Sequence, residues 1–353
     1  MVVGGNELEW PAVRRILPGL LITMTCAIAA RFLHGLLPAK AGAVVGEVVV
    51  AVLLGLVIGN LIKLPDLLAP GIRFSFHSLL RAAIVLLGAQ FSFAQVVAIG
   101  GKAVLMILVL MSLALLVAHM LGRAAGVPGR LATLIGVGTA VCGNTAITAT
   151  APVIHARDEE VSFAVATNTL FGTLAVFLYP LLGHALHLTD AAFGTWAGTA
   201  VNDTSQVVAT GFAYSDAAGK VATAVKLTRN ALMGVVIVGI GLAYGSGGVK
   251  SSVAARIKQS LPLFVLGFLL VAVLNTVGLV ARLGSWLHRD LAHDLQTISR
   301  FLILVALAGV GLSTRLGAMR KIGATPFFIG FATAATTATA SYFLIVWLGP
   351  AGG

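Results

Sequence analysis

Long apolar runs separated by short polar connections extend along almost the whole chain. A helix needs about 20 apolar residues to cross a hydrocarbon layer about 30 Å thick, and many of these runs reach that length. The pattern therefore predicts about nine transmembrane helices. They lie near residues 16–37, 43–62, 78–99, 103–121, 161–184, 220–245, 261–281, 298–316 and 325–348. The segment from Arg282 to Asp294, which contains Trp286, is expected to form an interfacial helix.

Two further segments, 130–155 and 189–214, are apolar at their ends and polar at their centres. The first contains GTAVCGNTAITAT from Gly138, and the second contains GTAVNDTSQVVAT from Gly198, 60 residues later. A helix broken at that depth in a membrane is tolerated only where its backbone is buried or lines a cavity. The simplest alternative is a pair of kinked helices, in which glycine and threonine residues relax the backbone hydrogen bonding.

The copies continue beyond the two breaks. NTLFG from Asn168 is echoed by NALMG from Asn230, so a unit of interrupted segment and following helix, 130–184, has a second copy at 189–245. If each segment returns as a re-entrant hairpin, the two following helices run antiparallel and the repeat is inverted, as in many secondary transporters. If each segment crosses the membrane, the copies run parallel. A weaker echo of RAAIVLLG in RFLILVAL, on helices of opposite direction, favours inversion and the hairpin arrangement.

The composition supports an all-α polytopic membrane protein, because 58% of the residues are hydrophobic and only 10% are charged. A soluble domain of that composition could not cover its own surface with polar side chains. Residues 1–353 are expected to form one integral membrane domain, with N-terminal helices in 16–121 and C-terminal helices in 261–348. Cys26 and Cys142 lie in apolar segments and offer neither a disulfide framework nor a metal site.

The formal net charge of +11 comes from short clusters of Lys and Arg between the apolar runs. If the N-terminus is cytoplasmic, all of these clusters fall on the cytoplasmic side, as the positive-inside rule requires. The charge therefore reflects orientation in the bilayer and does not indicate a nucleic-acid partner. The clusters are Lys63 with Arg73, Arg123 with Arg130, Lys250 with Arg256 and Lys258, and Arg315 with Arg320 and Lys321.

The two breaks are expected to meet near the centre of the membrane, and their polar residues form the candidate substrate site. Unpaired backbone N–H groups and the positive ends of the helices that start after each break suit an anion. Lys226 and Arg229 share one face of the helix after the second break, and their equivalents in the first copy are uncharged. They are expected to supply counter-charge, and snorkelling to the membrane surface is the alternative. The predicted substrate-binding residues are Thr139, Gly143, Asn144, Thr145, Asn202, Thr204, Ser205, Gln206, Lys226 and Arg229.

Asp203 is the acidic residue of the second break, and two roles stay open for it. It can cap the following helix, or it can take up a proton and couple transport to it. The cluster HARDEE from His155 is expected to begin a helix rather than to hold a metal ion. No spacing of residues indicates a catalytic nucleophile, a metal site or a cofactor, so an enzyme is the least favoured class.

The chain contains five longer motifs: APGIRF from Ala69, GTAVCGNTAITATAPVIHARDEEVSFA from Gly138, TLFGTLAVFLYPLLG from Thr169, AGTAVNDTSQVVATGFAYS from Ala197 and VKLTRN from Val225. Together they resemble the YeiH-type sulfate exporter family, and the resemblance extends over nearly the whole chain. That family is grouped with inverted-repeat secondary transporters related to cation/proton antiporters and bile acid symporters. The resemblance implies export of small sulfur oxyanions, such as sulfate, sulfite or small sulfonates, across the bacterial inner membrane.

The sequence therefore leaves two alternative transport functions. An exporter of small sulfur oxyanions accounts for the duplication, the breaks and the paired basic residues together. A cation/proton antiporter accounts for Asp203 but leaves Lys226 and Arg229 beside a cation site. The expected partners are a small sulfur anion and the lipid bilayer, and a homodimer is one option for the assembly.

Overall fold

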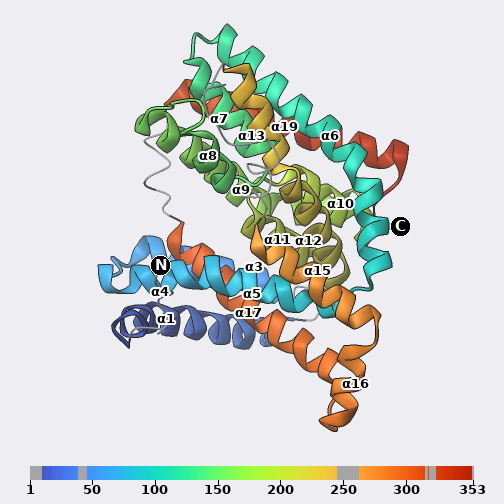
Figure 1. Ribbon diagram of the computed structural model, residues 1–353. Helices are drawn as coiled ribbons and strands as arrows, with labels where there is room; N and C mark the ends of the chain where they lie inside the picture. The colour runs from blue at the N-terminus through green and yellow to red at the C-terminus, as the bar shows by residue number, and fades with distance from the viewer. Residues whose placement is uncertain (1–9, 39–45, 245–261, 315–316, 318–322, 352–353) are drawn as a thin grey trace, which may run out of the picture. The chain divides into compact units, whose positions relative to one another are not determined.

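The computed structural model describes residues 10–38, 46–244, 262–314, 317 and 323–351, which form helices, turns and short connections without a strand (Figure 1). Within these residues, seven helices are long and apolar enough to cross a membrane, and an eighth span results if the bent pair α15–α16 counts as one. The shorter α3 is also apolar. The expectation of an all-α polytopic membrane protein is confirmed.

The helices are separated by short connections, and some spans combine several elements. The first half comprises α1 (Trp10–Gly35), α3 (Glu47–Leu61), η1 (Asp66–Leu68), α4 (Ala69–Phe74), η2 (Ser75–Leu79), α5 (Leu80–Leu87), η3 (Gly88–Gln90), α6 (Phe93–Ala124), α7 (Gly129–Ala140), α8 (Asn144–Thr150) and α9 (Asp158–Ala185). The second half comprises α10 (Asp190–Ala200), α11 (Thr204–Tyr214), α12 (Asp216–Ala231), α13 (Met233–Ala243), α15 (Leu263–Thr276), α16 (Leu279–Trp286), α17 (Leu291–Ser313) and α19 (Ala324–Leu348).

The predicted division between helices 78–99 and 103–121 is wrong. The structure ends one span at Gln90 and starts α6 at Phe93. The reason is a capping box, in which the Ser92 side chain accepts from the Gln95 amide and the Gln95 side chain accepts from the Ser92 amide. A capping box starts a helix inside an apolar run, which hydropathy does not detect.

The segment from Arg282 to Asp294, expected to form an interfacial helix, is divided between two helices and the connection that joins them. α16 ends at Trp286 and is bent by 70° from α15, and α17 has already begun at Leu291. Gly278 stands at the bend with a φ of +74°, a conformation that favours glycine. The basic clusters at 250–258 and 315–321 lie outside the described residues, apart from position 317.

The helices divide into two compact units, Met1–Ile84 with Thr297–Leu316 and Val85–Gln296 with Gly317–Gly353. In the first unit α1 packs against α3 and α4. Gly19 and Gly71 bring α1 and α4 so close that a Cβ on either would overlap the backbone of the other helix. Such small-residue contacts are typical of helix pairs in membranes.

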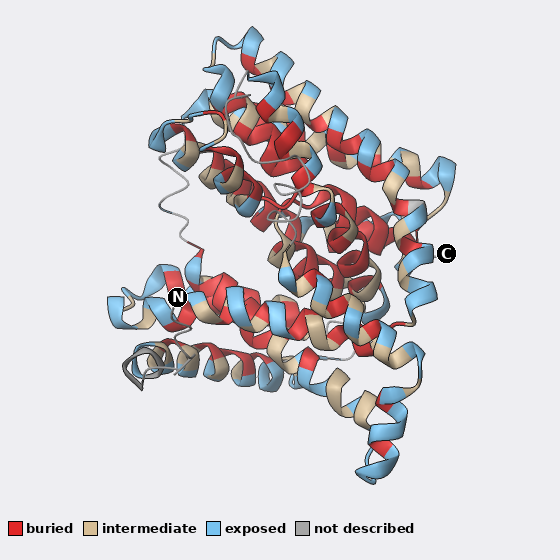
Figure 2. Cartoon of the chain, in the orientation of Figure 1, coloured by how far each residue is buried: buried red, intermediate tan, exposed pale blue. Residues whose placement is uncertain are grey.

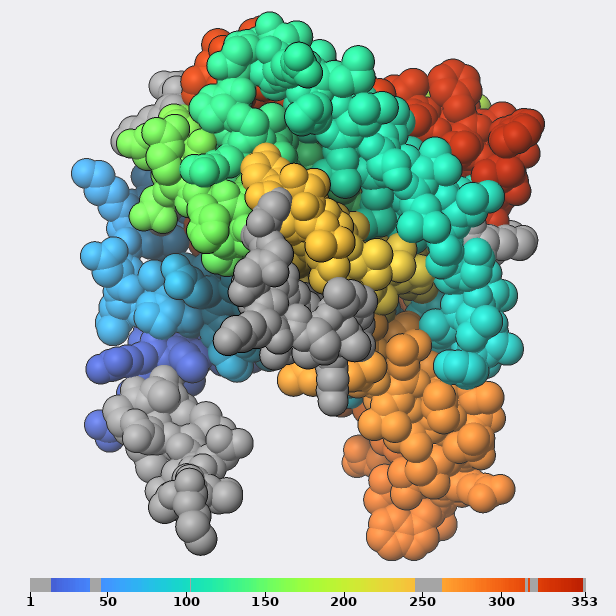
Figure 3. Space-filling model, turned by 45° about the horizontal axis from the view of Figure 1, so that its top comes forward, coloured from blue at the N-terminus to red at the C-terminus, as the bar shows by residue number. Residues whose placement is uncertain are grey.

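The second unit contains both copies of the duplicated sequence. α10, α11 and α12 form its most buried part (Figure 2), with Phe193 and Val207 completely buried. α13 (gold) reaches the surface of this unit in Figure 3, where Val235 and Leu242 are exposed. α6, α9 and α19 pack against these buried helices, and α7 packs against α6, α9 and α19.

Candidate functional site

The second interrupted segment is a re-entrant hairpin of α10 and α11. The start of α10 and the end of α11 lie side by side, as the stacked rings of Phe193 and Tyr214 show, with their centroids 3.9 Å apart. The Tyr214 hydroxyl also donates to the carbonyl of Leu188, and the Ser215 hydroxyl donates to the Asp190 carboxylate. A helix that crossed the membrane with a kink would hold these residues far apart.

The first interrupted segment, α7 and α8, also folds back on itself. A Cβ on Gly138 would lie 2.8 Å from the Cδ1 atom of Ile147, nine residues later. In a continuous helix the two residues would be about 13.5 Å apart along the axis. Gly143 makes the turn with a φ of +70° and a ψ of −128°, and its amide donates to the Gly138 carbonyl over 3.1 Å. The kinked-helix alternative is therefore wrong for both segments.

The two hairpins approach from opposite ends of the span formed by α12 and α13. α10 runs parallel to α12, since Gly194 near its start packs against Val221 and its last turn reaches Arg229. α7 runs in the reverse direction, because its last turn also reaches Arg229 while Thr133 near its start hydrogen-bonds to Tyr244 just beyond α13. The hairpin tips consequently meet in the middle of this span.

α9, which follows the first hairpin, runs parallel to α11. Near the start of α11 the Gln206 side chain donates to the Thr169 carbonyl over 3.1 Å. At the end of α11 the Tyr214 ring stacks on His184, with ring centroids 4.3 Å apart. Gln206 precedes Tyr214 in α11 as Thr169 precedes His184 in α9, so the two helices run in the same direction.

α12, which follows the second hairpin, runs antiparallel to α11. Asn230 near the end of α12 donates from Nδ2 to the Thr204 hydroxyl at the start of α11, over 3.2 Å. Gly219 near the start of α12 packs against Gly211 near the end of α11. α9 and α12 are therefore antiparallel, which is the relation that the hairpin arrangement requires of an inverted repeat.

The two hairpin tips are in direct contact. A Cβ on Gly143 would lie 3.0 Å from the Cα atom of Asp203 and 2.8 Å from the Nδ2 atom of Asn168. This close approach needs glycine at position 143, quite apart from its positive φ. The expectation that the two breaks meet is confirmed.

Lys226 lies between the tips with no exposed surface. Its Nζ atom donates to the carbonyl oxygens of Val141 over 2.8 Å and Val201 over 3.2 Å, and also to that of Asn202. The first carbonyl belongs to the end of α7 and the other two to the end of α10. One ammonium group thus joins the carbonyl ends of both hairpins.

Arg229 makes a second set of bonds to the same two ends. Its guanidinium donates to the carbonyls of Ala140 over 2.6 Å, Thr199 over 2.8 Å and Val201 over 3.1 Å, and to that of Thr139. The side chain is only 2% exposed. Snorkelling is therefore wrong for both cations, which complement the negative ends of the α7 and α10 dipoles.

Two asparagines at equivalent repeat positions support the tips, although neither was among the residues predicted from the sequence. Asn168 donates from Nδ2 to the Asn144 side chain over 3.0 Å, just as Asn230 donates to Thr204. Each asparagine is nearly fully buried, and its Oδ1 atom has no hydrogen-bond partner among the described residues. The echo of NTLFG in NALMG was the signal that could have identified them.

Asp203 caps α11, as one of its two expected roles requires. Its Oδ1 atom accepts from the Ser205 amide over 2.9 Å and from the Ser205 hydroxyl over 2.7 Å, and Gln206 completes a capping box. The Gln206 amide also donates to the hydroxyl of Thr173 on α9 over 3.3 Å. The cap fixes the second tip against α9.

The other residues singled out in the sequence have simpler surroundings. Thr139 is buried and contributes its backbone carbonyl, whereas the side chain of Thr145 is exposed. The sulfur of Cys142 lies 3.3 Å from the sulfur of Met233 in the buried interior. The HARDEE cluster begins α9, where Glu160 accepts from the backbone amide that precedes the helix. Among the described residues, no group of three His, Cys, Asp or Glu side chains could hold a metal ion.

The chain is similar to several bacterial membrane proteins. The family model of Conserved hypothetical protein 698 matches residues 18–330. A UPF0324 membrane protein of Streptococcus pyogenes serotype M6 is 38% identical over 90% of this chain and 92% of its own length. Another from Clostridium tetani is 30% identical over 96% of this chain and 99% of its own. A third, from Streptococcus agalactiae serotype V, is 35% identical over 90% and 92% of the two chains.

Proposed function

We propose that this protein is a secondary transporter of small anions. The chain belongs to the family of Conserved hypothetical protein 698, whose relatives are UPF0324 membrane proteins. The substrate class is the small sulfur oxyanions: sulfate, sulfite or small sulfonates. The direction is export across the bacterial inner membrane, with the N-terminus in the cytoplasm. The substrate site is the junction of the two hairpin tips.

One observation carries this proposal: two hairpins of opposite direction meet at their tips around Lys226 and Arg229. Non-helical backbone in the middle of a membrane is typical of transporter substrate sites, where it faces substrate instead of lipid. An inverted repeat also provides two related halves that can exchange roles between an inward-facing and an outward-facing state.

The charges at the tips favour an anion over a cation. Arg229 and the ammonium form of Lys226 each carry a full positive charge, and each helix end that they contact carries only about half a negative charge. Asp203 is the acidic residue at the tips. The two helix ends together offset about one of these two positive charges, so an excess of about one positive charge remains when Asp203 is protonated, and ionised Asp203 cancels it.

The two cations act on the anion through their charge, because their donors already bind backbone carbonyls. Direct hydrogen bonds come from the polar groups beside them: the second N–H of the Asn144 amide, whose first donates to Thr169, and the hydroxyl of Thr204, which among the described residues only accepts from Asn230. These groups are partly exposed. A small oxyanion suits this set, since neutral donors bind its oxygens while the buried charges offset its lost hydration.

Asp203 links the anion to a proton. Protonation removes one negative charge from the site, so the proton raises anion affinity and the anion raises proton affinity by the same factor. A divalent anion that leaves with one proton still carries net negative charge. The inside-negative membrane potential then drives it outward, with about 2.3 kcal/mol for each charge and each 100 mV.

The test is flux through the purified full-length protein in proteoliposomes. We expect radiolabelled sulfite or sulfate to move through the wild type, faster with an imposed membrane potential, and sodium not to move. Arg229→Gln should abolish anion flux, whereas Arg282→Gln, a change of an exposed arginine on α16, should leave it unchanged. Sodium moving in exchange for protons, without anion flux, would establish the cation/proton antiporter instead.

A further inference from the structure

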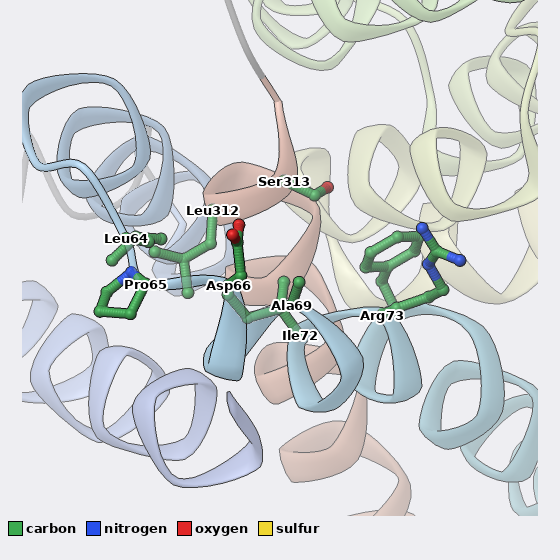
Figure 4. A pocket seen from close by; sticks show the side chains of 9 residues that line it. Leu64, Pro65, Asp66, Ala69, Ile72, Arg73, Leu312 and Ser313 are labelled. Carbon is green, nitrogen blue, oxygen red and sulfur yellow. The ribbon is translucent and has the colours of Figure 1, made fainter. Parts of the chain in front are cut away.

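A pocket of about 220 Å³ lies within the first unit, where α17 ends and η1 and α4 begin (Figure 4). Its walls combine the apolar side chains of Ile72, Phe76 and Leu312 with polar groups. Pockets for drug-sized ligands span about 300–1,000 Å³, so this one suits a smaller molecule. It includes residues of the APGIRF motif, for which the hairpin site gives no explanation.

The backbone around the pocket is held in place before any ligand arrives. Pro65 immediately precedes η1, and Pro70 stands in the first turn of α4, so two φ angles are fixed. Gly71 holds α4 against α1. Directly after α4 the helix widens into a π-helix, Ser75–Leu79, which contains Phe76 of the pocket wall. Short π-helical turns occur frequently at functional sites.

Two opposite charges line this pocket. Asp66 and Arg73 are seven residues apart, so they lie on one face of the helical segment, separated by about 10 Å along its axis. In Figure 4 the Asp66 carboxyl group and the Arg73 guanidinium stand on either side of the Ser313 hydroxyl. Both side chains are exposed, and neither makes an ion pair or hydrogen bond with the described residues.

We propose that this pocket binds a small zwitterion. Its ammonium group lies against the Asp66 carboxylate, and its oxyanion, a sulfonate or phosphate, accepts two N–H bonds from the Arg73 guanidinium. The short carbon chain between the two groups packs on Ile72 and Leu312. A simple anion would meet repulsion from Asp66 and a simple cation would meet repulsion from Arg73, so the paired charges select a molecule that carries both.

The same chemistry occurs in free aminoalkyl sulfonates and in the headgroup of phosphatidylethanolamine. Asp66 is the first residue of the apolar span Asp66–Gln90 and Arg73 lies two turns further along it. The carboxylate is therefore nearer the end of the span and the guanidinium nearer its middle. This order matches a lipid headgroup, whose ammonium lies outside its phosphate, as well as a solute that enters from water.

The first experimental arm is calorimetry on detergent-solubilised full-length protein with 2-aminoethanesulfonate. We expect binding of this zwitterion and at least tenfold weaker binding of ethanesulfonate and of ethylamine, each of which lacks one charge. Asp66→Asn and Arg73→Gln should each weaken binding about tenfold or more. Lys63→Gln, at an exposed position outside the pocket, is the matched control and should bind like the wild type.

The second arm places the protein in nanodiscs of phosphatidylethanolamine or phosphatidylcholine and measures thermal unfolding. A headgroup ligand predicts greater stability in phosphatidylethanolamine, lost in Asp66→Asn and Arg73→Gln, without binding of the free zwitterion. Equal binding of ethanesulfonate, or no effect of the two variants in either arm, overturns the proposal. Binding is measured here rather than flux, so this result and the transport proposal can fail separately.

Discussion

Replacing Arg229 with Met is expected to loosen both hairpin tips while the surrounding helices stay folded. The guanidinium joins the ends of α7 and α10 by donating to the carbonyls of Thr139, Ala140, Thr199 and Val201. Methionine fills a similar volume but donates nothing, so these buried carbonyls lose a charged partner. Changing this one side chain should therefore destabilise two segments that are about 60 residues apart in the sequence.

The size of the effect follows from the number of bonds and the burial of the charge. A hydrogen bond to a charged group contributes about 1.5–3 kcal/mol. Burying the guanidinium costs several kcal/mol in lost hydration, and methionine avoids that cost. The carbonyls of Thr139, Ala140 and Thr199 each lose their charged donor at a cost of about 1–3 kcal/mol, so after the regained hydration is subtracted we expect a net loss of about 3–5 kcal/mol. At one order of magnitude for each 1.4 kcal/mol, tip opening should become more frequent by about 100- to 4,000-fold.

Hydrogen–deuterium exchange read by mass spectrometry measures this opening directly. Peptides covering residues 138–146 and 198–208 should lose protection by that factor in Arg229→Met, while peptides from α1 remain unchanged. Arg229→Lys should fall between, because lysine keeps the charge but offers fewer donors. Arg282→Met, an exposed control on α16, should exchange like the wild type. Wild-type protection at both tips in Arg229→Met would show that the carbonyl bonds do not hold the hairpins together.

Three further substitutions separate the contributions of individual tip residues. Asp203→Asn keeps the cap, so thermal stability should change by less than about 1 kcal/mol. Flux in proteoliposomes should no longer respond to a pH gradient, and a retained response would show that Asp203 only caps α11. Gly143→Ala should destabilise more than Gly126→Ala, because both have positive φ but only the former would contact a neighbouring backbone, and equal melting temperatures would contradict this. Gly172→Ala should cost about 1–3 kcal/mol by overlapping Gln206, and a neutral result in thermal unfolding would refute the observed packing.

The repeat in the sequence was enough to predict the two hairpins and their contact. Identical GTAV motifs showed where the two breaks lie. Because non-helical backbone in a membrane has to be buried or line a cavity, the two breaks were expected to lie together. Helix boundaries were harder, as the helix start at Phe93 shows. That boundary depends on reciprocal bonds of Ser92 and Gln95, which a hydropathy average does not represent.

The partners of Lys226 and Arg229 could not be predicted from the sequence. Both residues were recognisable as unusual charges in an apolar helix, but their partners are backbone carbonyls, which every residue type carries. Only the three-dimensional path of α7 and α10 determines which carbonyls are left without a helical partner. Asn168 and Asn230 were missed because a single amide in an apolar helix is not distinctive by itself; only their equivalent places in the NTLFG and NALMG copies mark them.

The most direct test of the central claim is a structure determined with selenate, an analogue of sulfate whose selenium atom can be located by anomalous scattering. We predict one strong peak between the hairpin tips, within hydrogen-bond reach of Asn144 or Thr204 and close to Lys226 and Arg229. The peak should be absent in crystals of Arg229→Gln. No peak at the tips under saturating selenate, in protein that still transports the anion, would contradict the account.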